Sequence, residues 1–271
     1  AVAVTEPDFG SQATAMTTMA RRDGEDWILD GHKAFISNGP IADVYVVLAR
    51  TGEAGSGAKG ISAFVVERGD AGFGQGAAYR SMGMHGAPFS HLHFEHCRIP
   101  ADRLLGGVTG EGFRQTWQAF LFQRVQLSAL SIGPAIRLVD EGLRWAMQRR
   151  QFDRAIADHQ LIQAKLAQCQ TEIQAARALV LETARRYDDG EEMVLEASAS
   201  KYFATEMACK VADRVVQIFG ARGYFADFSC AERLYRDVRG HRLAEGTSEI
   251  HQLTIAREMY KRASQAQEIT Q

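Results

Sequence analysis

The chain changes its hydrophobic periodicity once, and this change separates two parts. Up to about residue 107, apolar residues come in short β-branched and aromatic runs between glycine-rich turns, as at residues 43–49 and 61–66. From residue 111 onward, they recur at helical spacing over much longer segments. Strands joined by short turns favour an antiparallel barrel or sandwich, and long helices need one another's apolar faces. The sequence therefore predicts an α+β fold, with an antiparallel β-barrel-like domain followed by an α-helical bundle.

The boundary between the two parts is expected in the segment 105–112, which carries four glycines. We therefore assign residues 1–107 to a β-domain and residues 108–271 to a C-terminal helical domain. In the first domain, residues 25–36 predict a hairpin that turns at Asp30-Gly31.

Three long helices are expected in the second domain, at residues 113–147, 159–186 and 191–219. Gly133-Pro134 predicts a kink or a break in the first of them, because proline removes a helical hydrogen bond. Gly220 follows the third helix as its stop signal.

Composition bounds the kind of protein. A chain of 271 residues with 46% apolar residues can form one large domain or two ordinary ones. Its net charge of −2 gives no general attraction to nucleic acid or to an anionic membrane. No apolar run in the sequence approaches the length of a membrane span. The four cysteines are far apart and form no CxxC pair, which is typical of reduced thiols, so we expect a cytoplasmic protein.

Two local patterns resemble ligand sites but are better explained otherwise. Residues 55–60 match GxGxxG, yet a strand follows them where a dinucleotide site needs a helix, so we interpret them as a hairpin loop. A second group contains His85, His91, His93, His96 and Cys97. No second cysteine and no helical histidine pair completes a tetrahedral zinc set there, so we expect a solvated strand face and no metal site.

A seven-residue run near the C-terminus, Glu-Gly-Thr-Ser-Glu-Ile-His at residues 245–251, combines a carboxylate, a flexible residue and a helix start. Thr247 or Ser248 can cap the helix. Glu245 then lies at a helix N-terminus next to the hinge residue Gly246, which is a suitable place for a general base. Alone, a run of this kind is more often an ordinary helix start.

Four further segments accompany this run, in a fixed order. They are Val-Thr-Glu-Pro-Asp-Phe-Gly-Ser at 4–11, Gly-His-Lys-Ala-Phe-Ile-Ser-Asn-Gly at 31–39, Arg-Arg-Gln-Phe-Asp-Arg at 149–154 and Gln-Ile-Phe-Gly-Ala-Arg-Gly-Tyr at 217–224. Each alone also fits a turn, a hairpin corner, a solvated helix end or a helix C-cap. Together they resemble the acyl-CoA dehydrogenase family of FAD enzymes, over essentially the whole chain.

The resemblance implies roles in holding FAD. Phe35 and Ser37 stand where the family commonly has Trp and Thr, and they keep an aromatic cover and a hydroxyl donor. The guanidinium of Arg149 suits phosphate and, with Phe152, would hold the pyrophosphate and adenosine side. The segment around Gly220 would reach the FAD of a neighbouring subunit. The implied cofactor-binding residues are Val4, Thr5, Ser11, Phe35, Ile36, Ser37, Arg149, Phe152, Gln217, Gly220, Ala221, Thr247 and Glu249.

The resemblance also implies the chemistry. Glu245 matches the family's catalytic base, which removes the α-proton of an acyl thioester while the β-hydrogen leaves as hydride to flavin N5. Ser11, Arg124 and Gly246 match substrate contacts. A subset of the family carries its base on the long helix beside the arginine at Arg124, but here the preceding residue is Gln123. An apolar pocket should raise the pKa of Glu245, and the helix N-terminus should lower it.

The resemblance therefore implies α,β-dehydrogenation of an acyl-CoA or acyl-carrier-protein thioester, with electrons passing to an electron-transfer flavoprotein. An oxidase, or a reductase running in the other direction, stays open as a variant of this activity. The alternative is a non-catalytic FAD-binding or scaffolding subunit of a heteromeric relative. The family's N-terminal helical domain has no match here, so we expect it on the same polypeptide or on a partner, in a homo-oligomer or heteromer. Leu121 and Ala244 depart from the family's usual residues, and both positions concern the substrate.

Overall fold

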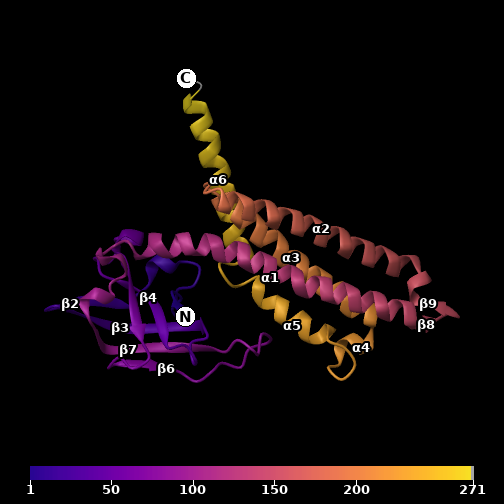
Figure 1. Cartoon of the computed structure of the whole chain (residues 1–271), viewed down its shortest axis with the longest axis horizontal. Helices are drawn as coiled ribbons and strands as arrows, with labels where there is room; N and C mark the ends of the chain where they lie inside the picture. The colour runs from indigo at the N-terminus through magenta and orange to yellow at the C-terminus, as the bar shows by residue number, and fades with distance from the viewer. Residues whose placement is uncertain (270–271) are drawn as a thin grey trace. The chain divides into compact units, whose positions relative to one another are not determined.

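The computed structural model describes residues 1–269 (Figure 1). The chain forms two compact units, Ala1–Ala119 and the residues from Phe120 onward. Each unit has its own hydrophobic core. They are described separately below.

Within residues 1–119, seven strands form one curled sheet in the order β1-β4-β2-β3-β7-β6, with β5 on the other edge of β4. The pairs are antiparallel, except that β1 and the first residue of β2 pair with β4 in parallel. The strands are β1 (Val2–Ala3), β2 (Met19–Asp23), β3 (Asp26–Ser37), β4 (Val44–Arg50), β5 (Ile61–Glu67), β6 (Phe73–Gln75) and β7 (Phe89–Ile99). Short 3-10 helices are η1 (Ala13–Ala15), η2 (Gly57–Gly60), η3 (Ala101–Arg103) and η4 (Leu105–Gly107).

The hairpin turn expected at Asp30-Gly31 is wrong, because β3 runs through both residues. The chain turns earlier, at Gly24, and joins β2 to β3. Gly31 instead lies at a register shift between β3 and β7, with φ +144°. A Cβ there would lie 2.7 Å from the Thr18 Cα, so glycine allows a close backbone approach rather than a turn.

The glycine-rich segment that follows the sheet packs closely on β5. Gly110 adopts φ +83° and donates its N–H to Ser62 Oγ at 2.9 Å. A Cβ on Gly112 would lie 2.3 Å from the Ala63 nitrogen, so only glycine fits against the strand.

The second unit is helical, and Figure 1 shows α2 and α3 running alongside α1. Its helices are α1 (Gly112–Gln148, from Phe120 in this unit), α2 (Gln160–Asp188), α3 (Val194–Phe219), α4 (Ala221–Tyr224), α5 (Ala231–His241) and α6 (Ser248–Ile269). A small ribbon of β8 (Arg150–Gln151) and β9 (Arg154–Ala155), followed by η5 (Ile156–Asp158), connects α1 to α2. Buried side chains of α1, α2, α3 and α5 form its core. The predicted α+β fold, a β-domain followed by a helical bundle, is confirmed.

Of the kink or break predicted at Gly133-Pro134, the break is wrong, since α1 continues through Pro134. Proline leaves the Leu130 carbonyl without its usual helical donor. Leu130 is 55% exposed, so water can satisfy that carbonyl. Gly220 ends α3 as predicted, with φ +64°.

None of the helices described over residues 1–269 combines the length and apolar character that crossing a bilayer requires. Over the same residues, no three His, Cys, Asp or Glu side chains gather in a group that could hold a metal ion. The four cysteines are free thiols.

Candidate active site

Glu245 lies in the turn that joins α5 to α6, and its backbone is unusual. Glu245 and Gly246 both adopt a left-handed conformation, with φ +56° and φ +99°. A side chain at position 246 would be strained by this backbone, and its Cβ would approach His251 Nε2 to 3.2 Å. The glycine beside the carboxylate is therefore required by the turn.

Two buried side chains hold the carbonyls of this turn. Lys201 of α3 donates from Nζ to the Gly246 oxygen at 2.7 Å, and His251 of α6 donates from Nε2 to the Glu245 oxygen at 3.2 Å. Both Lys201 and His251 are 0% exposed. The turn is thus tied to α3 and to the first turns of α6.

The start of α6 is capped by Thr247, whose Oγ1 accepts the Ile250 N–H at 3.3 Å. The next residue, Ser248, donates to Glu206 Oε1 at 2.6 Å, and the same oxygen accepts Arg242 Nε at 2.5 Å. Glu206 therefore joins the end of α5 to the start of α6 and fixes both sides of the turn.

At least one oxygen of the Glu245 carboxyl group makes no hydrogen bond within residues 1–269. Its Oε2 atom is buried and has no hydrogen-bond partner among residues 1–269. Burial raises the pKa of Glu245 above its ordinary value, while the charges of Arg124 and Lys201 oppose that shift. A buried carboxyl oxygen without a donor is a site where a proton can be accepted.

Basic side chains from three helices lie around the Glu245 turn, and two of them, Arg124 and Lys201, act electrostatically on its carboxyl group. Arg124 of α1 is 2% exposed and lies 3.5 Å from Ser198 Oγ through Nη1. Burial lowers the pKa of Arg124 to about 10, and Glu245 opposes the shift. Burial also lowers the pKa of Lys201 to about 8 and that of His251 to about 3. At neutral pH, His251 is therefore a neutral imidazole, whereas Arg124 and Lys201 are cations.

A second feature of the helical unit is a pocket of ≈ 410 Å³ between the end of α1, the β8–β9 ribbon and the end of α3. Its lining includes four residues predicted from the sequence to bind the cofactor, namely Arg149, Phe152, Gly220 and Ala221. Trp145 and Phe219 stack in its wall, with ring centroids 5.6 Å apart. Gln217 is exposed on α3, one turn before Gly220.

Residues at the mouth of this pocket are solvent-accessible. The Phe152 ring is 88% exposed, with φ +53°, and the Arg149 guanidinium lies 6.0 Å from the Trp145 ring. A planar cation beside stacked aromatic rings is a donor set that suits a phosphate attached to a heterocyclic base.

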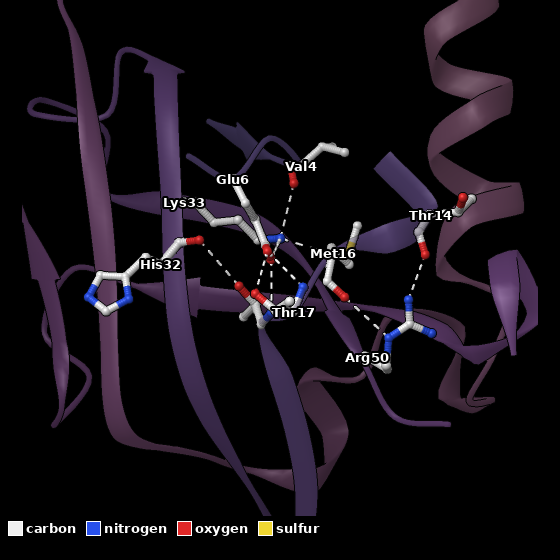
Figure 2. Close-up of polar contacts among 9 residues, drawn as sticks. Val4, Glu6, Thr14, Met16, Thr17, His32, Lys33 and Arg50 are labelled. Carbon is white, nitrogen blue, oxygen red and sulfur yellow. Dashed lines mark hydrogen bonds and ion pairs between the residues drawn. The ribbon is translucent and has the colours of Figure 1, made fainter. Parts of the chain in front are cut away.

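In the β-unit, the candidate residues Val4, Thr5 and Ser11 belong to the loop between β1 and β2, and Figure 2 shows how this loop is held. Lys33 of β3 donates from Nζ to the Val4 oxygen and to Glu6 Oε1, both at 3.0 Å. Glu6 also accepts the backbone N–H groups of Thr17 and Thr18, at 2.7 and 2.8 Å. Thus one buried ion pair ties both ends of the loop to β3.

The Glu6 carboxylate is fully engaged. Burial alone would raise its pKa, but the Lys33 ammonium and the hydrogen bonds from Thr17 and Thr18 outweigh burial and bring the pKa to about 2. The same loop also receives Arg50, whose guanidinium donates to the carbonyls of Thr14 and Met16 (Figure 2).

The other candidate residues of the β-unit lie near the end of β3. Phe35 is 63% exposed, adopts φ +58° and packs beside Tyr79, with ring centroids 5.6 Å apart. Ser37 is exposed, whereas the Ile36 side chain is buried in the sheet core. Because neighbouring residues point to opposite faces, Ile36 could meet a ligand only through its backbone.

The structure thus brings the predicted residues together in three groups, each within one unit. Arg124, Gly246 and Thr247 surround Glu245, with Glu249 exposed at the start of α6. A second group lines the pocket, and a third lies on the β1–β2 loop and the end of β3.

Two residues at the Glu245 turn were missed by the sequence reasoning, Lys201 and His251. A signal for Lys201 exists, because it falls on the apolar face of α3 together with Ala197, Ala204 and Ala208, which are all buried. A lysine at helical spacing within such a stripe indicates a buried ammonium.

Comparison with family models gives two adjacent matches. Residues 1–97 match the acyl-CoA dehydrogenase middle domain, and residues 110–260 match the acyl-CoA dehydrogenase C-terminal domain. Together the two matches cover nearly the whole chain.

Among curated proteins, the chain is 41% identical over 261 residues to the 3-(aryl)acrylate reductase of Clostridium sporogenes, covering 96% of this chain and 68% of that protein. It is 35% identical over 262 residues to the caffeyl-CoA reductase-Etf complex subunit CarC of Acetobacterium woodii, covering 97% and 68%. Among solved structures, butyryl-CoA dehydrogenase from Megasphaera elsdenii matches with a TM-score of 0.92 and 31% identity, covering 96% of this chain and 67% of that one. The chain thus spans about two thirds of the length of these relatives.

Proposed function

The chain belongs to the acyl-CoA dehydrogenase family of oxidoreductases, and from this premise we propose that it carries the centre for flavin-dependent α,β-dehydrogenation of an acyl thioester. One observation supports this most strongly, namely the buried Glu245 carboxyl group with an unpartnered oxygen at a left-handed turn. We assign Glu245 as the group that removes the α-proton.

FAD is the cofactor of this family, so the cofactor expected from the sequence is confirmed. The residues present suit it, since Arg149 and the stacked rings of Trp145 and Phe219 form a pocket with the right donor set for an adenosine pyrophosphate. We propose that Phe35 and the β1–β2 loop contact the flavin side. When bound, FAD supplies a two-electron acceptor that takes the β-hydrogen as hydride.

Proton removal is carried by this chain's own groups. Burial disfavours the charged form of Glu245 and thus increases its affinity for a proton. The charges of Arg124 and Lys201 oppose this effect of burial on the pKa of Glu245, because they favour the carboxylate. Since a base works best when its pKa approaches the working pH, this balance suits abstraction of a weakly acidic α-proton. We propose that the backbone N–H of Glu245 donates to the thioester carbonyl and stabilises the enolate-like charge.

A second candidate is the reverse reaction, reduction of an α,β-unsaturated thioester. The observation that favours it is that both curated relatives described above are named reductases, one for 3-(aryl)acrylates and one for caffeyl-CoA. In that direction, protonated Glu245 would deliver its proton to the α-carbon, and its raised pKa favours the protonated form. An aryl-substituted acyl group is then the preferred substrate class.

We propose an electron-transfer flavoprotein as the redox partner, since one relative is named as a subunit of a reductase-Etf complex. Assembly as a homo-oligomer or as a heteromer with a related subunit is also proposed. The alternative is a non-catalytic FAD-binding or scaffolding subunit of a heteromeric relative, since one relative is named as a subunit of a complex. The Glu245 carboxyl argues for catalysis, because a scaffold gains nothing from an unsatisfied buried acid.

The test is anaerobic reduction of the flavin by a panel of saturated acyl thioesters, some with aryl groups. A parallel panel of enoyl and arylacrylyl thioesters is mixed with chemically reduced protein to assay the reverse reaction. Wild type should react with at least one thioester, and Glu245→Gln should bind FAD without reacting. Glu182→Gln, an exposed carboxylate on α2, serves as the control and should behave as wild type. Full reactivity of Glu245→Gln would overturn the assignment.

A further inference from the structure

Lys201 is buried at a high cost that packing alone does not explain. Its side chain is 0% exposed, and among residues 1–269 the Gly246 carbonyl is the single hydrogen-bond acceptor of its ammonium. An ammonium removed from water needs several acceptors or a paired anion to offset the loss of hydration. A buried ammonium that has one hydrogen-bond acceptor and interacts electrostatically with Glu245 indicates a role at the Glu245 turn.

The other buried lysine shows what full compensation looks like. Lys33 is also 0% exposed, but it lies within hydrogen-bond distance of the Val4 carbonyl, Glu6 Oε1 and, at 3.7 Å, Met16 Sδ (Figure 2). Its contacts serve the β1–β2 loop. Lys201 instead donates to one backbone carbonyl, that of Gly246, which is the residue after Glu245.

His251 completes the arrangement from the opposite side. As a neutral imidazole, it carries one ring proton, and a carbonyl can only accept, so the proton lies on Nε2 toward the Glu245 oxygen. The other ring nitrogen, Nδ1, is buried without a hydrogen-bond partner among residues 1–269. His251 therefore donates its single ring N–H to the backbone carbonyl of Glu245.

We propose that Lys201 and His251 are positioning residues, which hold the consecutive carbonyls of Glu245 and Gly246 and thereby fix the left-handed turn that presents the carboxyl group. The two donors offset part of the cost of keeping Glu245 in a conformation that non-glycine residues avoid. In this arrangement Lys201 acts both by its hydrogen bond and by its charge, whereas His251 acts by its hydrogen bond alone. The inference rests on the proposed function only in taking Glu245 as the base.

The charges around the turn come from each element packed against it. Arg124 on α1 and Lys201 on α3 favour the Glu245 carboxylate. Glu206 on α3 and Arg242 after α5 act on Lys201 with opposite signs, and they pair with each other at 2.5 Å. Loss of the Lys201 charge therefore leaves Arg124 as the remaining cation that favours ionised Glu245.

The experiment uses the FAD-loaded protein and four variants. Lys201→Met removes the charge and the donor, and Lys201→Arg retains both. His251→Leu removes the donor, and His251→Gln restores an N–H donor on a side chain of similar reach. Lys210→Met is the control, since Lys210 is an exposed lysine on the same helix.

Two measurements need no substrate. Amide hydrogen exchange of residues 245–248 should speed up about 10-fold or more in Lys201→Met and in His251→Leu, and return toward wild type in Lys201→Arg and His251→Gln. Infrared titration of the Glu245 carboxyl should show an upward pKa shift in Lys201→Met and none in His251→Leu. Exchange and titration that match wild type in both variants would overturn the proposal. If Lys201→Met does not fold, the two histidine variants decide it by the same exchange measurement.

With a reactive thioester, both donor-removing variants should lower the rate of flavin reduction about 10- to 100-fold while KM changes less than about threefold. The acid limb of the pH profile should move upward only in Lys201→Met. A rate that falls merely in proportion to lost FAD would contradict positioning. If wild type itself reacts with no thioester, the proposed function fails. Hydrogen exchange and infrared titration, which need no substrate, still test whether Lys201 and His251 hold the turn.

Discussion

Each unit of the molecule places a glutamate carboxyl group near a buried lysine, and the two glutamates behave in opposite ways. In the β-unit, Glu6 accepts hydrogen bonds from Lys33, Thr17 and Thr18, and its pKa falls to about 2. In the helical unit, Glu245 keeps an oxygen without a partner, and its pKa is raised.

Burial raises the pKa and neighbouring cations lower it in both carboxyl groups, but only Glu6 also accepts hydrogen bonds that lower its pKa. A buried carboxylate whose lone pairs are engaged is held ionised and stabilises the fold around it. A buried carboxylate that lacks donors costs free energy and binds a proton readily. A buried glutamate beside a lysine is therefore not by itself a sign of catalysis, and what distinguishes Glu245 from Glu6 is its unsatisfied oxygen.

Of the changes that distinguish Glu245 from Glu6, Glu245→Gln should have the largest effect, which is on the rate of flavin reduction. Loss of the base should slow reduction of the flavin by a thioester about 10³-fold or more. FAD binding should persist, because Arg149 and the pocket around it are unchanged. Stopped-flow absorbance after anaerobic mixing measures the rate. Glu6→Gln should leave a much larger residual rate once its FAD content is taken into account, and equal losses in both variants would erase the distinction.

Next in size is the loss of stability from breaking the Glu6–Lys33 pair. Lys33→Met should destabilise the β-unit by about 3 kcal/mol, since it leaves a buried carboxylate without its cation. The double variant Glu6→Gln/Lys33→Met should recover part of that loss, because no unpaired charge remains. Urea unfolding monitored by tryptophan fluorescence measures both. A single variant as stable as wild type would show that the pair contributes nothing.

A smaller effect is expected at the pocket of the helical unit. Arg149→Met should weaken FAD binding about 10- to 100-fold, the equivalent of one charge-assisted hydrogen bond of about 1.5–3 kcal/mol. Equilibrium dialysis or flavin fluorescence measures the affinity. Arg137→Met, on an exposed part of α1, is the matched control and should bind FAD as wild type does. Unchanged affinity in Arg149→Met would remove the pocket from the FAD site.

The smallest effect is a pH dependence of opposite sign at the two glutamates. The pKa of Glu6 lies below its ordinary value of 4.5, so its contribution to stability is present above pH 4.5 and is lost as pH falls toward about 2. The pKa of Glu245 is raised, so its charge costs stability at neutral pH, and this cost disappears as pH falls below the folded pKa.

At neutral pH, Glu245→Gln and Glu6→Gln should therefore change the free energy of unfolding in opposite directions relative to wild type. Glu245→Gln should be at least as stable as wild type at pH 7, with the difference shrinking as the solution is acidified. Glu6→Gln should be less stable at pH 7, and its difference should shrink only at much lower pH. Urea titrations at pH 7, 5 and 3 measure this, and parallel curves for the two variants would contradict the opposite shifts.

Much of the fold could be predicted from the sequence, because apolar periodicity reports secondary structure directly. The switch from strands to helices and the end of α3 at Gly220 followed from that pattern. The turn at Asp30-Gly31 did not, since a glycine required for close approach to Thr18 has the same sequence signature as a turn glycine. Pro134 did not break α1, and the residue whose carbonyl loses its helical donor, Leu130, is exposed.

The site could be predicted only where its residues form a local run. Glu245, Gly246 and Thr247 are neighbours in sequence, and their turn and cap chemistry is local. Lys201 and His251 act on the turn through tertiary contacts, and nothing in their immediate sequence specifies the carbonyls they hold. Likewise, the face on which Ile36 lies depends on the register between β3 and β7.

The central claim is that Glu245 accepts a proton from the α-carbon of an acyl thioester, and isotope exchange tests it without the redox step. Protein with chemically reduced FAD, which cannot accept hydride, is incubated with a saturated acyl thioester in D₂O. Mass spectrometry then measures deuterium at the α-carbon. Wild type should incorporate deuterium, and Glu245→Gln should do so about 10³-fold more slowly. Exchange by Glu245→Gln at the wild-type rate would contradict the claim.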